Sequence, residues 1–149
     1  MRLRIFGVLA ALSLLSISCG GSSGKAGAAG FSLASLKGSY AGIFSGKINT
    51  GTQLLTFLGT GIFIADGAGN LTGHETYTVV STPCDATIKG TYTVEADGSG
   101  TNAVTFTTSS PGCTSGTYTQ SLAIAQSNEL VLLSNTNGDQ INEQWHLQN

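Results

Sequence analysis

Residues 65–80 read ADGAGNLTGHETYTVV, a glycine-rich turn followed by a run that alternates between two kinds of side chain. The Asp, Asn and Gly residues of the turn tolerate the backbone angles of a tight hairpin. In the run that follows, Leu71, Tyr77 and Val79 fall on one face together with Glu75, whereas threonines occupy most of the other face. This stretch therefore predicts a hairpin strand with one buried and one solvated face.

The same pattern recurs along the rest of the chain. Short β-rich runs alternate with turn sequences, and eight such runs can be counted, at residues 38–46, 53–64, 71–80, 87–95, 102–108, 117–125, 130–134 and 140–147. Because the connectors are short, each strand is expected to pair with its successor. We predict an all-β fold, an eight-stranded antiparallel up-and-down barrel, with a β-sandwich as the alternative.

Composition supports one all-β domain. The chain has 149 residues, 21 of them glycine, and only 9% of its residues are charged. A helical bundle needs charged, solvated faces that this composition does not supply. The length suits a single domain with a core large enough to fold unaided.

The N-terminal segment has the layout of an export signal. Two arginines precede an apolar run from Ile5 to Ile17, which predicts a signal peptide over residues 1–18. The residues Ser16-Ile17-Ser18-Cys19 resemble the lipobox of bacterial lipoproteins, and this resemblance implies lipidation of Cys19; ordinary cleavage is the alternative. We expect an exported protein of the periplasm or cell envelope, tethered to the membrane through an N-terminal lipid anchor.

A flexible tether is expected to follow the signal. Residues 19–30 are rich in Gly, Ser and Ala, which cannot bury a hydrophobic face. The barrel domain is therefore predicted over residues 31–149. Without its signal peptide the chain has four Lys against eight Asp and Glu, a net charge of −4, so nucleic acid is not an expected partner.

Cysteine usage predicts one disulfide bond. If Cys19 carries a lipid, Cys84 and Cys113 remain as a pair in an oxidising compartment. Cys84 falls in the predicted connector between the third and fourth strands, and Cys113 in the connector between the fifth and sixth. An up-and-down order places both connectors at the same end of a barrel, which favours a Cys84–Cys113 disulfide over two unpaired thiols.

Three polar residues interrupt the predicted inner face. Glu75, Gln120 and Glu143 stand in line with apolar residues, and a buried carboxylate is costly unless it is paired. They either meet a polar partner, reach a hydrated barrel rim, or contact a ligand. On the ligand-binding interpretation, the pocket is lined by the three polar residues and four aromatic ones: Glu75, Tyr77, Tyr92, Tyr118, Gln120, Glu143 and Trp145.

No catalytic or metal-binding motif stands out. Both histidines, His74 and His146, fall on the outward face without a cluster of further ligands. We therefore expect no catalytic residues, no metal and no cofactor, and we do not predict an enzyme.

The arrangement of runs resembles the lipocalin-like, calycin-type barrels. The resemblance rests on eight antiparallel runs, on Gly38-Ser39-Tyr40 opening the first, and on the apolar lead-in of residues 31–36, which can form a helical turn over one end. It implies a barrel that binds a small, largely apolar ligand. Two alternatives are a structural or interaction protein of the envelope with a solid barrel core and no ligand, and an isomerase or cyclase acting inside the barrel.

Overall fold

The computed structural model describes residues 30–125, 130–135 and 138–149. The predicted signal peptide, the lipidation residue Cys19 and the tether up to residue 29 lie outside the described residues. A short 3-10 helix, η1 (Leu33–Ser35), precedes the strands. The strands are β1 (Lys37–Asn49), β2 (Leu54–Asp66), β3 (Asn70–Val79), β4 (Thr82–Tyr92), β5 (Ser99–Thr108), β6 (Gly116–Ile124), β7 (Leu130–Asn135) and β8 (Gln140–Leu147).

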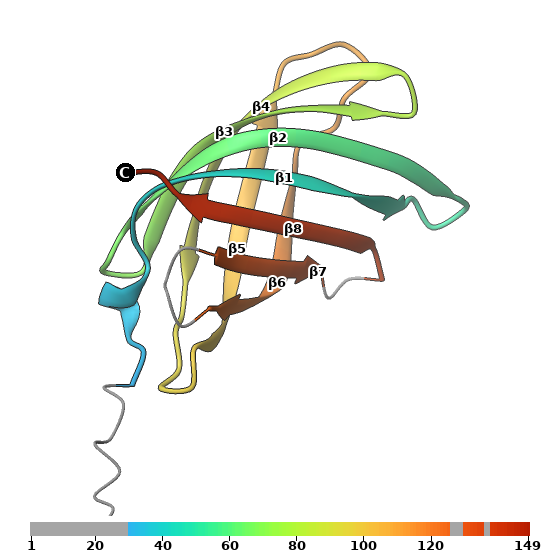
Figure 1. Ribbon diagram of the computed structural model, residues 1–149. Helices are drawn as coiled ribbons and strands as arrows, with labels where there is room; N and C mark the ends of the chain where they lie inside the picture. The colour runs from blue at the N-terminus through green and yellow to red at the C-terminus, as the bar shows by residue number, and fades with distance from the viewer. Residues whose placement is uncertain (1–29, 126–129, 136–137) are drawn as a thin grey trace, which may run out of the picture.

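The strands form one antiparallel sheet in chain order. Each strand pairs with its successor, and β8 also pairs with β1, so the sheet curls round an interior (Figure 1). Hairpin pairing in chain order follows from the short connectors. The predicted all-β, barrel-like fold is confirmed, and the strands do not divide into the two packed sheets of a sandwich.

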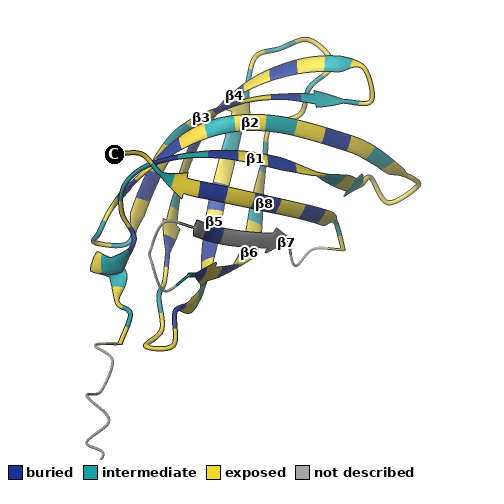
Figure 2. Ribbon diagram, in the orientation of Figure 1, coloured by how far each residue is buried: buried dark blue, intermediate teal, exposed yellow. Residues whose placement is uncertain are grey.

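Burial alternates along the strands (Figure 2). On β3, β6 and β8 the residues predicted to face inward are buried or half-buried. The polar residues between them are mostly exposed, and they are chiefly threonines on β3 and β6 and Asn142, Gln144 and His146 on β8. Side chains of successive residues point to opposite faces of a strand. The alternation in the sequence therefore assigned these faces correctly.

The fourth strand begins earlier than the sequence indicated. It starts at Thr82 rather than at residue 87, so Cys84 lies inside β4, opposite Tyr77, and not in a connector as predicted. The pair Thr82-Pro83 is typical of a turn, but proline is tolerated near the start of a strand, where few ladder hydrogen bonds are lost. The connector is only Val80 and Ser81.

The long apolar second run forms one continuous strand. Two of its glycines face inward, and they make room for neighbouring side chains. A Cβ atom on Gly59 would overlap the Phe44 ring, and one on Gly61 would lie 2.8 Å from Cγ of Glu75. The absence of side chains at these two positions lets larger groups of β1 and β3 occupy the interior.

Among the described side chains, the exposed large hydrophobic residues gather on the outer face of the first two strands. Ile43 on β1 and Leu58, Ile62 and Ile64 on β2 are each about half exposed or more. We call these four residues the outer apolar stripe. Scattered exposed hydrophobic residues are common on proteins.

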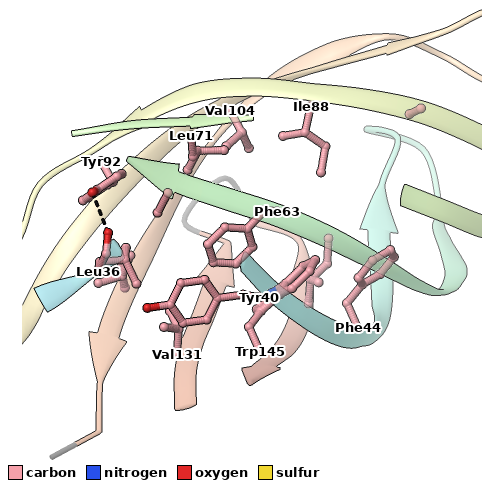
Figure 3. Close-up of a cluster of buried hydrophobic side chains, with 14 of the residues drawn as sticks. Leu36, Tyr40, Phe44, Phe63, Leu71, Ile88, Tyr92, Val104, Val131 and Trp145 are labelled. Atoms are coloured by element: carbon pink, nitrogen blue, oxygen red, sulfur yellow. Dashed lines mark hydrogen bonds between the residues drawn. The ribbon is translucent and has the colours of Figure 1, made fainter. Parts of the chain in front are cut away.

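One end of the interior is packed solid. The η1 turn lies beneath Tyr92, whose hydroxyl donates to the Leu36 carbonyl oxygen at 2.7 Å and accepts from the Gly67 N–H at 2.9 Å (Figure 3). Tyr40 stacks on Phe63 with ring centroids 4.8 Å apart just above this turn. The helical turn predicted from the apolar lead-in is therefore present, and it closes this end.

No helix within the described part of the chain is long and apolar enough to cross a membrane.

Candidate ligand-binding cavity

The other end of the interior contains a cavity of about 390 Å³. Its outer boundary is formed by connector residues, Thr50 after β1 and Gly112, Cys113 and Thr114 after β5. Its walls are mainly apolar and aromatic, contributed by Ile48, Leu55, Phe57, Tyr77, Val79, Phe106, Tyr118 and Ile141. Pockets for small molecules commonly measure about 300–1,000 Å³ and have this predominantly apolar lining.

Three polar side chains form the floor of the cavity. Glu75, Gln120 and Glu143 line it, and the same three also line a second, much smaller space of about 20 Å³. That smaller space is bounded on its far side by Leu36 and Trp145, toward the packed end. The three polar groups therefore separate the cavity from the solid part of the core.

A chain of hydrogen bonds orders this floor. The Asn102 Nδ2 amide donates to Oε1 of Gln120 at 3.1 Å, and Nε2 of Gln120 donates to Oε1 of Glu143 at 2.6 Å. The Trp145 indole N–H donates to the second Glu143 oxygen, Oε2, at 2.9 Å. Both carboxyl oxygens of Glu143 thus accept a hydrogen bond, which is the arrangement that an ionised carboxylate requires.

Glu75 differs from Glu143 in having no such donors. It is only 3% exposed, and the donors described above, Gln120 and Trp145, both bind Glu143 instead. Burial, followed by the repulsion of Glu143, raises the pKa of Glu75 to about 9. At neutral pH Glu75 is therefore a neutral acid at the cavity floor.

The two carboxyl groups consequently differ in acidity. Burial also raises the pKa of Glu143, but the hydrogen bonds from Trp145 and Gln120 act in the opposite direction. These donors make Glu143 the stronger acid, so it is the first of the pair to ionise. Any negative charge at the floor resides mainly on Glu143.

The tyrosines of the walls are neutral. Burial is the main cause that raises the pKa of Tyr77 and of Tyr118, and nearby acidic groups add to it. Tyr77 packs against Phe57 with ring centroids 5.2 Å apart, and Tyr118 packs edge-on against Phe106 at 5.3 Å. The walls thus present two aromatic pairs.

Five of the seven residues predicted to line a pocket do line this cavity: Glu75, Tyr77, Tyr118, Gln120 and Glu143. Trp145 lies behind the floor, where it orients Glu143. Tyr92 lines neither cavity, because its position on β4 brings it to the packed end. Glu75 and Glu143 are only 3% and 6% exposed. The alternative that these residues reach a hydrated rim therefore does not hold for either of them.

One buried polar residue that supports the floor from behind was not predicted from the sequence. Asn102 is buried on β5 and its Oδ1 atom has no hydrogen-bond partner among the described residues. It stands two positions before Val104, so the alternation of β5 already indicated an inward side chain.

The predicted disulfide is confirmed. Cys84 on β4 is bonded to Cys113 in the connector after β5, and their Cα atoms are 5.9 Å apart. Because Cys113 lines the cavity, this bond holds the β5–β6 connector at the cavity mouth.

The histidines lie outside the cavity. His74 pairs through Nε2 with Oδ1 of Asp85 at 2.7 Å on the exposed surface, and His146 is exposed on β8. Within the described ranges, no three His, Cys, Asp or Glu side chains gather in a way that could hold a metal ion.

No protein-family model matches the chain, and neither a curated protein nor a solved structure shows significant similarity to it. The function is therefore inferred from the cavity and its lining.

Proposed function

We propose that this is an exported, lipid-anchored envelope protein whose closed, eight-stranded, lipocalin-like barrel binds a small, largely apolar ligand. The observation that carries the proposal is the cavity of about 390 Å³ at one end of an interior whose other end is tightly packed. Protein interiors normally fill with side chains at crystal-like density. A space of this size, lined by aromatic and aliphatic groups with a few polar anchors, is typical of a ligand site.

The closed form of the barrel is supported by the backbone ladders of β7. This strand pairs with β6 on one side and with β8 on the other, and β8 pairs with β1. An eight-stranded closed barrel has an interior wide enough either to fill with side chains or to hold one small ligand. The cavity favours the second possibility over the solid-core alternative.

Binding of an uncharged fluorescent probe tests the ligand-binding proposal. N-phenyl-1-naphthylamine brightens when it enters an apolar site, so the protein should enhance its fluorescence saturably with a stoichiometry near one. Val79→Trp fills the cavity and should abolish this binding. Ile43→Trp adds the same side chain on the outer surface and serves as the matched control.

The same two variants show which result would contradict ligand binding in the cavity. If Val79→Trp retains its fold by circular dichroism and still binds the probe as the parent protein does, the cavity is not the binding site. If probe binding is lost only in Ile43→Trp, the probe binds to the outer apolar stripe instead.

The anchor is tested separately. With Cys19→Ala in a bacterial host, the protein should move from the membrane fraction to the soluble fraction, because the acyl chains hold it at the membrane. An unchanged membrane fraction would contradict lipidation at this cysteine.

A further inference from the structure

The ligand cavity contains acidic groups and no basic ones among the described residues. Lys37, Lys47 and Lys89 are all exposed, and none of them lines the cavity. The two arginines of the chain, Arg2 and Arg4, fall within the predicted signal peptide. Among the described residues, the carboxyl group of Glu143 is therefore met by neutral donors alone, the Gln120 amide and the Trp145 indole.

The groups that face Glu75 from the surrounding strands are equally free of positive charge. β8 contributes Glu143, β6 contributes Gln120 and Tyr118, and β3 itself contributes Tyr77. Directly opposite Glu75 across the sheet, β2 and β4 present Gly61 and Ala86. Glu75 is thus a buried carboxyl group that lines the cavity and has no cationic partner among the described side chains.

The walls above the floor suit an organic cation. The pairs Phe57–Tyr77 and Phe106–Tyr118 line the cavity as aromatic surface. Aromatic faces attract cations and pack well against apolar bodies. A ligand with an apolar body and a positively charged end would match both the walls and the floor.

We propose that the ligand is a lipophilic amine, with its ammonium group against Glu75 and Glu143 and its apolar body between the aromatic walls. This inference rests on the proposed ligand-binding function and specifies the chemical class of the ligand. An ammonium group supplies the cation that the described lining lacks, and it donates hydrogen bonds that a carboxylate accepts strongly.

Binding of such a ligand is coupled to the release of a proton. The amine enters as R–NH₃⁺ and remains protonated, while the Glu75 carboxyl group loses its proton to the buffer and becomes a carboxylate. Near neutral pH one proton is therefore released for each amine bound. A neutral or anionic ligand releases none.

Three indole compounds that differ only in the terminal group provide the test. Tryptamine carries an ammonium group, tryptophol a hydroxyl group and indole-3-propionate a carboxylate, each on the same two-carbon indole side chain. Their affinities are measured calorimetrically with the parent protein at pH 7.5. Each titration is repeated in phosphate and in Tris, whose different ionisation enthalpies report the number of protons released.

The expected order is tryptamine first, tryptophol about tenfold weaker, and indole-3-propionate weakest, because only the amine brings a positive charge to the carboxyl groups of the floor. About one proton should be released with tryptamine alone. In Glu75→Gln the preference for tryptamine over tryptophol should fall, because one of the two carboxyl partners is lost, and the proton release should disappear. Glu95→Gln, which makes the same substitution at an exposed position, should behave as the parent protein does.

The outcomes separate the two proposals. Tryptophol binding as tightly as tryptamine, while N-phenyl-1-naphthylamine still binds in the cavity, overturns the amine inference and leaves the ligand-binding function standing. Loss of tryptamine preference in Glu95→Gln as well as in Glu75→Gln also overturns it, since the effect would then not be specific to the cavity floor. Failure of all three compounds and of the fluorescent probe overturns both.

Discussion

Replacing Glu75 by Gln is expected to remove much of the pH dependence of this protein's stability. The pKa of Glu75 is about 9 in the folded protein and 4.5 in an unperturbed side chain. Because the folded pKa is the higher one, the folded state holds a proton that the unfolded state releases between these values. The stabilising effect of this proton is complete below pH 4.5 and is lost as the pH rises through 9.

The magnitude follows from the shift in pKa. Each unit corresponds to about 1.4 kcal/mol, so the free energy of unfolding should fall by about 3 kcal/mol between pH 4.5 and 7, and by about 6 kcal/mol by pH 9. A domain of this size is stable by about 5–15 kcal/mol, so the loss is a large fraction of the total. Glu75→Gln keeps the shape of the side chain but has no proton to lose.

Urea denaturation at several pH values measures this effect. The chain has one tryptophan, Trp145, which is 1% exposed and so reports unfolding by its fluorescence. The difference in free energy of unfolding between Glu75→Gln and the parent protein should grow steadily from pH 5 to pH 9. The control Glu95→Gln, at an exposed position, should follow the parent curve.

Two results would refute the reasoning. One is a pair of parallel curves for Glu75→Gln and the parent protein, since Glu75 would then have an ordinary pKa. The other is a Glu95→Gln curve that diverges in the same way, because the effect would then come from overall charge.

Three further changes test separate parts of the structure. Gly61→Ala should destabilise the fold by about 1–3 kcal/mol in urea denaturation, because the new Cβ would lie 2.8 Å from Cγ of Glu75; an unchanged stability would contradict the close approach. Replacing Cys84 and Cys113 together by Ser should cost about 3–4 kcal/mol, the value for opening a loop of this length, and equal melting temperatures with and without reductant would argue against the bond. Tyr92→Phe removes the hydroxyl that ties the lead-in to β4 and should cost about 1 kcal/mol without changing probe affinity; a weakened affinity would place this residue in the site after all.

The inner face of several strands could be predicted because their outer face is polar. Alternation on β3, β6 and β8 separated inward Glu75, Gln120 and Glu143 from outward polar residues. On β2 both faces carry apolar residues, with Phe57 and Phe63 inward but Leu58 and Ile62 outward. Period-two alternation gives no signal there, so the outer apolar stripe was not predictable.

The end of the interior at which an inward residue lies could not be predicted from the sequence pattern. Tyr77 and Tyr92 both face inward, yet one lines the cavity and the other contacts the lead-in at the packed end. Alternation shows which face of the sheet a residue lies on. Whether that residue lies near the cavity or near the packed end depends on the register between strands and on what covers each end. The cavity itself depends on the packing of side chains from several strands, which no single stretch of sequence encodes.

A titration followed by methyl NMR tests the central claim, that this protein binds ligands in its interior cavity, most directly. Tryptamine is added to protein with labelled Ile and Val methyl groups. The methyl signals of Ile48, Val79 and Ile141, which line the cavity, should shift in a saturable way, while Ile43, Ile62 and Ile64 on the outer surface stay in place. Shifts confined to the outer residues would contradict an interior site and would assign binding to the outer apolar stripe.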